Sequence, residues 1–223
     1  MKSRLFYYLI ALLLTSCTID NYKIPNITLS GNIIDSETGQ LVPSSGINNG
    51  TIIKVFEGAS NQPLMFNTQP DGTFKNSRLF ADNYRIVAEG PFKSITDTLN
   101  VDISADKKIE FKVLPNVRLK LTSQFLDDST ADIEIKYTKV NSEAKLMKLG
   151  VVWSTYPYPN ETVFPNGNII LEDVSSLELT KGRKAYKVTE LEPSTKYYIR
   201  AVGLSDNEGN YYNYSTQITI ETE

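Results

Sequence analysis

Aromatic side chains are concentrated at two places in this sequence of 223 residues. The two groups are Trp153, Tyr156 and Tyr158, and, nearer the C-terminus, Tyr211, Tyr212 and Tyr214. An aromatic face offers flat apolar area to a sugar ring, and a tyrosine hydroxyl can hydrogen-bond the hydroxyl groups of the sugar. Rings of this kind on exposed loops would therefore suit an oligosaccharide ligand.

The same residues also have an ordinary structural interpretation. Alternation places Trp153 on the same strand face as Val151, which favours a position in the core. Tyr156 and Tyr158 flank prolines, which take the chain out of a strand and leave both rings on a loop. For these two rings, ligand contact and ordinary packing stay equally open. The candidate ligand-binding residues are Tyr156, Tyr158, Tyr211 and Tyr212.

The first residues have the pattern of an export signal. Lys2 and Arg4 precede an apolar run from Leu5 to Leu14. That run is too short for a membrane helix, which takes about 20 apolar residues. We therefore predict a signal peptide over residues 1–16.

The sole cysteine of the sequence comes directly after this segment, in Leu14-Thr15-Ser16-Cys17. These four residues resemble the lipobox of bacterial lipoproteins. The resemblance implies a lipid on the sulfur of Cys17, which anchors the protein to a membrane through a tether over residues 17–26. An ordinary buried thiol is the alternative.

Composition argues against several functional classes. Without histidine, neither a Ser-His-Asp triad nor a Cys-His pair can form, and a zinc site would have to use carboxylates alone, which is rare. Removing residues 1–16 takes away Lys2 and Arg4, so 21 of the 23 basic residues are left against 26 acidic ones, an unsuitable balance for nucleic acid. A two-carboxylate glycosidase stays chemically possible, but nothing places such a pair across a cleft. We therefore expect no catalysis, cofactor, metal or nucleic-acid partner.

Alternating apolar and polar residues predict short strands through the rest of the sequence. The clearest runs are residues 27–33, 51–57, 84–88, 98–103, 108–113, 117–121 and 131–137. Turns are expected at Asp71-Gly72 and at Asp206–Asn210, which lacks the spaced carboxylates of a calcium loop. Pro115-Asn116 ends one group of strands, so we expect two domains, residues 27–115 and 116–223.

Two segments resemble known β-sandwich families. Leu29 to Leu41, together with Pro70 to Phe74, is similar to the carboxypeptidase regulatory-like, transthyretin-type sandwich. Leu191 to Ala201 is similar to the penultimate strand of a fibronectin type III domain, with Tyr197 as a corner tyrosine whose hydroxyl meets nearby backbone. The expected fold is therefore all-β, with two tandem β-sandwiches, the second fibronectin type III-like or immunoglobulin-like.

The fibronectin resemblance also bears on the aromatic groups. In such a sandwich, the loop after the third strand and the last hairpin lie at opposite ends, roughly 20 Å apart. We therefore expect at most one of the two groups to form a compact site.

The order of the parts resembles uncharacterised lipoproteins encoded beside SusC/SusD-type outer-membrane uptake pairs. The resemblance implies an outer-membrane lipoprotein at the cell surface, an accessory of nutrient uptake that binds oligosaccharide or the transporter pair. The alternative is a structural spacer, scaffold or adhesion lipoprotein with no small-molecule ligand.

Overall fold

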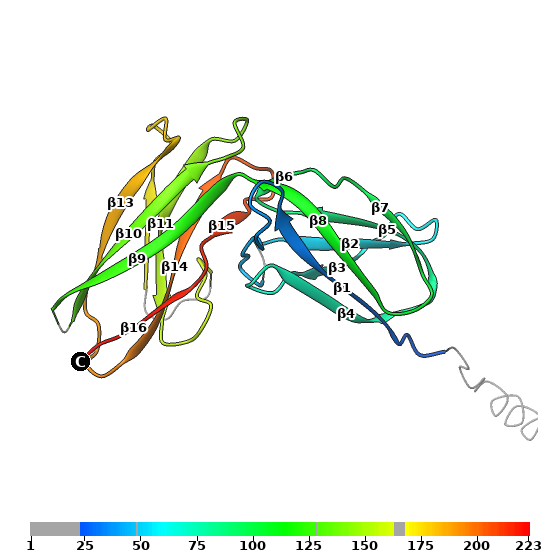
Figure 1. Ribbon diagram of the computed structural model, residues 1–223, viewed down its shortest axis with the longest axis horizontal. Helices are drawn as coiled ribbons and strands as arrows, with labels where there is room; N and C mark the ends of the chain where they lie inside the picture. Colours follow the sequence, from blue (N-terminus) through cyan, green and yellow to red (C-terminus); the bar gives the residue numbers. More distant parts are fainter. Residues whose placement is uncertain (1–22, 48, 128, 163–167) are drawn as a thin grey trace, which may run out of the picture.

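The structure, a computed structural model, describes residues 23–223 except residues 48, 128 and 163–167 (Figure 1). The predicted signal peptide, Cys17 and most of the tether lie outside the described residues. The described residues form strands and no helix, so they include no helix with the length and apolar character needed to cross a membrane. The predicted all-β class with sandwich-like domains is confirmed.

The first domain consists of eight strands in two four-stranded sheets. These strands are β1 (Ile27–Asp35), β2 (Ile52–Glu57), β3 (Leu64–Asn67), β4 (Thr73–Leu79), β5 (Asp82–Glu89), β6 (Phe92–Ser94), β7 (Leu99–Ile103) and β8 (Lys107–Pro115). One sheet has the order β4-β1-β8-β6 and the other β3-β2-β5-β7. β1 and β8 are parallel neighbours, whereas the other pairs are antiparallel.

Alternation explains how these strands close a core. Leu29 and Ile33 of β1, Ile53 of β2 and Phe111 of β8 are fully buried between the two sheets. The predicted turn at Asp71-Gly72 joins β3 to β4, and Gly72 has φ +88, where a Cβ would overlap the backbone of Val42. Glycine is therefore required at that turn.

The second domain also contains eight strands. They are β9 (Val117–Asp127), β10 (Thr130–Lys139), β11 (Leu146–Ser154), β12 (Ile169–Asp173), β13 (Lys181–Val188), β14 (Lys196–Ser205), β15 (Tyr212–Tyr214) and β16 (Ile218–Glu221). A three-stranded sheet, β13-β10-β9, faces a five-stranded sheet, β12-β11-β14-β15, in which β16 also pairs with β14.

Two sequence predictions can be followed in this domain. Trp153 is 8% exposed and lies in the core with Ile133 and Ile199, as alternation predicted. The hydroxyl of Tyr197 accepts a hydrogen bond from the backbone N of Glu192 at 3.0 Å, which is the contact expected of a corner tyrosine.

The five-stranded sheet carries a second apolar cluster on its other face. It contains Val152, Val202, Leu204, Tyr212 and Tyr214. Residues of β14 alternate between this cluster and the main core. The sheet is therefore buried on both faces, whereas an antiparallel sheet commonly has one face on the core and the other in solvent.

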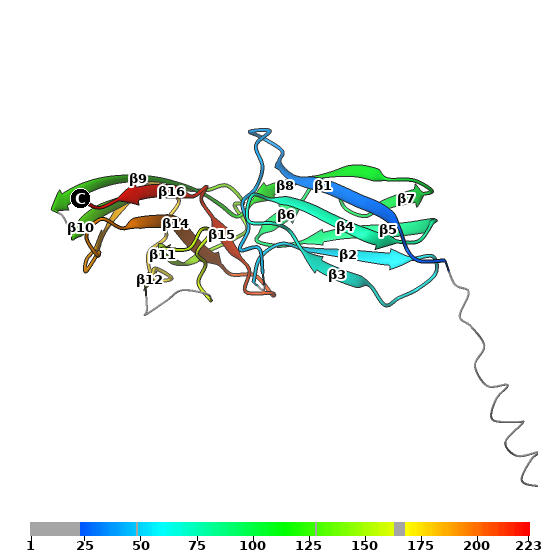
Figure 2. The same ribbon diagram turned by 90° about the horizontal axis from the view of Figure 1, so that it is seen from below.

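Buried polar side chains join the two domains, which lie end to end (Figures 1 and 2). Asn116, between β8 and β9, donates to Ser205 Oγ at 2.7 Å and accepts from Asn141 Nδ2 at 2.9 Å. Asn213 donates to the carbonyl of Pro91 at 3.0 Å and accepts from Val117 N at 3.2 Å. The bond from Asn213 to Pro91 crosses between the domains, and the other three hold the second domain's side of the contact in place.

Candidate functional site: a cavity between the two domains

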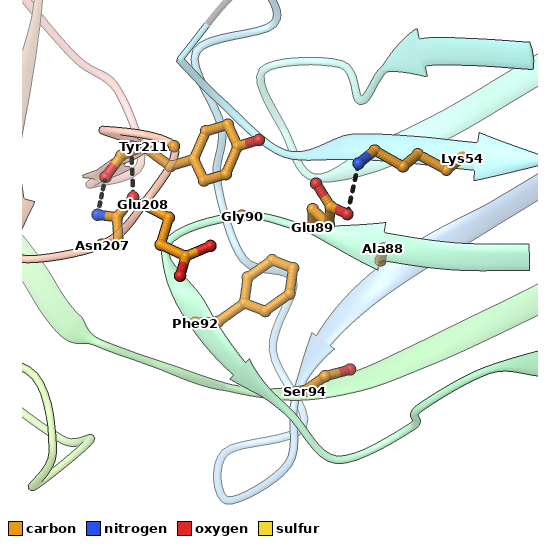
Figure 3. A pocket seen from close by; sticks show the side chains of 10 residues that line it. Lys54, Ala88, Glu89, Gly90, Phe92, Ser94, Asn207, Glu208 and Tyr211 are labelled. Carbon is orange, nitrogen blue, oxygen red and sulfur yellow. Dashed lines mark hydrogen bonds and ion pairs between the residues drawn. The ribbon is translucent and has the colours of Figure 1, made fainter. Parts of the chain in front are cut away.

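A cavity of about 580 Å³ lies where the two domains meet (Figure 3). The first domain contributes residues of β2, β5, β6 and the β5–β6 turn, and the second contributes the hairpin between β14 and β15. The lining residues are Lys54, Ala88, Glu89, Gly90, Phe92, Ser94, Asn207, Glu208, Gly209 and Tyr211.

Two aromatic rings in this cavity lie close against glycines. A Cβ on Gly90 would approach the Phe92 ring to 2.5 Å, and a Cβ on Gly209 would overlap the ring of Tyr211. Any other residue at either position would displace the ring beside it. The two glycines therefore determine where the aromatic surfaces of the cavity lie.

Polar groups surround these rings. Lys54 Nζ pairs with Glu89 Oε1 at 2.5 Å, and their side chains are 26% and 40% exposed. Burial, followed by the negative charge of Glu89, raises the pKa of the Tyr211 hydroxyl. That hydroxyl therefore stays protonated at neutral pH and can donate a hydrogen bond.

Asn207 holds the hairpin that carries Tyr211. Its Nδ2 donates to the carbonyls of Ser205 at 2.8 Å and Tyr211 at 3.0 Å, and its Oδ1 accepts from Tyr211 N at 2.7 Å. Asp206–Asn210 is thus a hairpin turn, as predicted. Among the described residues, no group of three or more His, Cys, Asp or Glu side chains could hold a metal ion.

The structure separates the four candidate tyrosines. Tyr211 lines the cavity, whereas Tyr212, the next residue, is 8% exposed and packs with Val202 on the second apolar cluster. The ring of Tyr212 is therefore too buried for sugar stacking, which corrects its place among the candidates. Tyr156 and Tyr158 are 73% and 46% exposed on the loop after β11, and neither lines this cavity.

The expected separation of the two aromatic groups is only partly right. β11 ends at Ser154, which pairs with Tyr198 near the start of β14, at the opposite end from the β14–β15 hairpin. The following residues then turn back toward the hairpin strand, because Glu161 N donates to the hydroxyl of Tyr214 at 3.5 Å. A long loop can return along a sheet, and strand topology alone does not reveal this.

Phe92, Lys54 and Glu89 were not among the sequence-predicted site residues. They belong to the first domain, and they share a cavity with Tyr211 only because the domains pack end to end. The one local signal is Gly90-Pro91, a turn directly before Phe92.

Residues 27–114 match the family model described as "Protein of unknown function (DUF3823) N-terminal domain". The whole two-domain chain is also similar to solved structures. A DUF3823 family protein from Bacteroides uniformis ATCC 8492 has a TM-score of 0.78 and 17% identity, over 89% of this chain and 100% of the other. One from Parabacteroides merdae ATCC 43184 has a TM-score of 0.72 and 16% identity, over 89% and 100%.

Another similar structure has a functional description. It is a Bacteroides uniformis ATCC 8492 protein described as "a putative carbohydrate binding protein", with a TM-score of 0.72 and 22% identity over 88% of this chain and 99% of the other. Comparison with curated proteins found no match. The chain thus has the fold of DUF3823 proteins, and none of these three similar structures is described as an enzyme.

Proposed function

We propose that this protein is a non-enzymatic carbohydrate-binding protein and that the cavity between its domains binds the sugar. The observation that carries the proposal is the meeting of Phe92 and Tyr211 with the Lys54–Glu89 ion pair in one cavity. The carbohydrate-binding description of the similar Bacteroides uniformis protein supports the same function.

The chemistry of the cavity suits a sugar. The two rings can pack on the apolar faces of a pyranose, while the ammonium of Lys54 and the carboxylates of Glu89 and Glu208 bond its hydroxyl groups. The volume of about 580 Å³ lies within the roughly 300–1,000 Å³ typical of small-molecule sites.

We further propose an accessory role beside a SusC/SusD-type transporter pair in the outer membrane, at the cell surface. The resemblance of residues 14–17 to a lipobox supports an anchor at Cys17. The described chain enters the first domain at the end away from the second domain, so the cavity is held away from the anchored end (Figure 2). Protease treatment of intact cells tests the location, and complete protection of the protein would contradict surface exposure.

Titration calorimetry of the chain from residue 18 onward against a panel of neutral oligosaccharides tests the sugar site. We expect Tyr211→Ala and Phe92→Ala each to weaken binding at least roughly tenfold, a change of about 1.4 kcal/mol. Tyr156→Ala is the matched control, since that ring is exposed and lines no part of the cavity. Absence of binding heat with every sugar of the panel would contradict the proposal.

A scaffold or adhesion protein is the second candidate function. Buried hydrogen bonds between the domains favour it, because Asn213 Nδ2 and the backbone N of Asn116 both donate to the carbonyl of Pro91, as a rigid spacer requires. Pull-down with the lipidated protein from detergent-solubilised outer membrane separates the two functions. Recovery of a transporter pair without sugar, unaffected by Tyr211→Ala, would favour the scaffold.

A further inference from the structure

Arg200 is a buried cation at the contact between the two domains. It is 1% exposed, and it lies on the face of β14 that carries the second apolar cluster. Its guanidinium carbon lies 4.2 Å from the ring centre of Tyr214. Its Nη2 reaches the first domain, where it donates to the carbonyl of Ser44 at 2.8 Å and to that of Pro70 at 3.4 Å.

One nitrogen of this guanidinium has no hydrogen-bond partner. Nε donates to the carbonyl of Ser215 at 3.3 Å, but Nη1 is buried and unpartnered. The identified partners of the guanidinium are neutral carbonyls and a ring, so the positive charge has no ion pair among the described residues. A buried charge without a hydrogen-bonded counter-charge is costly, and this arrangement favours an anion.

The carboxylate of Glu161 does not fill that role. Its Oε1 accepts from Asn49 Nδ2 at 3.1 Å and from Thr162 Oγ1 at 3.1 Å, while its Oε2 is itself buried without a partner. Burial raises the pKa of Glu161 and lowers that of Arg200 to about 9, with only partial compensation from Tyr158 and Glu161. Both groups therefore lack a full ionic partner.

A second cavity of about 580 Å³ adjoins Arg200, and it shares no residue with the cavity of Tyr211. The last strand is interrupted beside it: Ser215 pairs with Ala201 through its backbone N and its hydroxyl, and the chain leaves the ladder between β15 and β16. The residues lining it are Gln40, Leu41, Pro43, Pro70, Asp71, Tyr158, Arg200, Ser215, Thr216 and Gln217.

We propose that this second cavity binds a uronic acid, with the sugar carboxylate accepting hydrogen bonds from Arg200. The ring of Tyr158 and the prolines of the first domain offer apolar surface to the pyranose, and Thr216 and Gln217 offer hydrogen bonds to its hydroxyl groups. Because Nε and Nη2 already donate to backbone carbonyls, the sugar carboxylate would accept from Nη1, in a hydrogen bond between opposite charges. The inference that the ligand carries a carboxylate depends on Arg200 alone, whereas the inference that it is a sugar rests on the function proposed above.

Nuclear magnetic resonance titration of the chain from residue 18 onward tests this site. The probes are glucuronate and galacturonate, with glucose and galactose as neutral counterparts and acetate as a bare carboxylate. We expect the uronates to shift the Arg200 side-chain Nε–H signal saturably and the neutral sugars to leave it unchanged. The site is ruled out if neither uronate shifts that signal saturably at concentrations up to about 50 mM. It is also ruled out if the neutral sugars shift the signal as much as the uronates do.

Two variants sharpen the test. Tyr158 has φ +58, so Tyr158→Gly removes the ring while keeping the backbone conformation, and it should weaken uronate binding about tenfold. Tyr156→Ala, on the same loop but outside the cavity, should bind uronate as the native protein does. Equal binding by Tyr158→Gly and the native protein would overturn the proposed site.

Arg200→Lys keeps the charge but lacks Nη1, and we expect it to lose uronate binding while it retains the native thermal midpoint within a few degrees. If this variant unfolds, the comparison of Tyr158→Gly with Tyr156→Ala still tests the site. Acetate that binds as tightly as the uronates would show an anion site without sugar specificity and so overturn the proposal. Tyr211→Ala should leave uronate binding unchanged, which keeps failure here distinct from failure of the neutral-sugar site.

Discussion

At the scale of single residues, glycines control the proposed sugar site. Phe92 and Tyr211 provide its aromatic surfaces, and Gly90 and Gly209 leave the space those rings occupy. The sequence identified Tyr211 as a candidate because tyrosines are concentrated there. It could not identify Phe92, because a lone phenylalanine after a turn has no pattern that sets it apart from a core residue.

Replacing Gly209 by alanine should displace the ring of Tyr211 and weaken sugar binding about as much as Tyr211→Ala does. The physical cause is steric, since the added Cβ would overlap the ring. Titration calorimetry with the best neutral oligosaccharide measures the effect.

Asn210→Gly is the control for this variant. Asn210 lies in the same turn with φ +51, a conformation glycine adopts easily, so this change should leave sugar binding and stability close to native. Unchanged affinity in Gly209→Ala would show that the ring position does not matter for binding.

At the scale of secondary-structure elements, strands whose residues alternate could be predicted and strands without alternation could not. β1, β8 and β10 alternate between buried residues and partly buried or exposed ones, and this pattern is clear in the sequence. β6 has three residues and β12 has no fully buried residue, so neither produces an alternation. β13 contains four lysines and arginines and buries only Tyr186 and Val188, a composition typical of a protected edge strand.

Tyr186 links this edge strand to the opposite sheet. Its hydroxyl donates to the carbonyl of Leu149 at 3.0 Å, and burial, followed by the charge of Glu172, raises its pKa and keeps it protonated. Tyr186→Phe leaves that buried carbonyl without this donor. We expect the free energy of unfolding to fall by about 0.5–1.5 kcal/mol, measured by urea denaturation.

Tyr156→Phe, at an exposed ring, is the matched control and should leave the urea midpoint unchanged. Equal midpoints for Tyr186→Phe and the native protein would mean that the cross-sheet hydrogen bond contributes nothing measurable to stability.

At the scale of the whole molecule, both proposed cavities depend on how the domains meet. Each cavity takes residues from both domains, and the partners of Arg200 in the first domain are backbone carbonyls that no side-chain pattern identifies. The sequence predicted an all-β chain with sandwich-like domains. It could not predict their relative placement, because asparagine and arginine in a sequence ordinarily indicate exposed positions, whereas here they are buried at the domain contact.

An ion pair across the same interface should make stability depend on pH. Arg118 pairs with Asp35 through Nε to Oδ2 at 2.5 Å and Nη2 to Oδ1 at 2.7 Å. Burial alone would raise the pKa of Asp35, but hydrogen bonds from Arg118 and from the backbone of Glu37 outweigh it and hold the pKa below its usual 3.8.

A carboxyl whose pKa is lower in the folded state stabilises the protein above its unfolded value and loses that effect as pH falls through the folded value. The native protein should therefore exceed Asp35→Asn in free energy of unfolding at pH 5–7, and the difference should shrink below pH 3.8. Urea denaturation at each pH measures this difference.

Glu143→Gln provides the comparison for Asp35→Asn. It removes the ion pair between Glu143 and Lys93, whose side chains are 70% and 49% exposed respectively. The change should therefore alter stability little at any pH. A difference between native protein and Asp35→Asn that stays constant down to pH 2 would contradict the linkage.

The parallel pairing of β1 and β8 also has a mechanical meaning. The chain enters β1 at the end away from the second domain and leaves β8 at Pro115, beside that domain (Figures 1 and 2). Tension between the N-terminal side and the second domain therefore pulls the two strands past each other lengthwise. Their hydrogen bonds then share the force together instead of opening one at a time, so the first domain is built to resist stretching along its own axis.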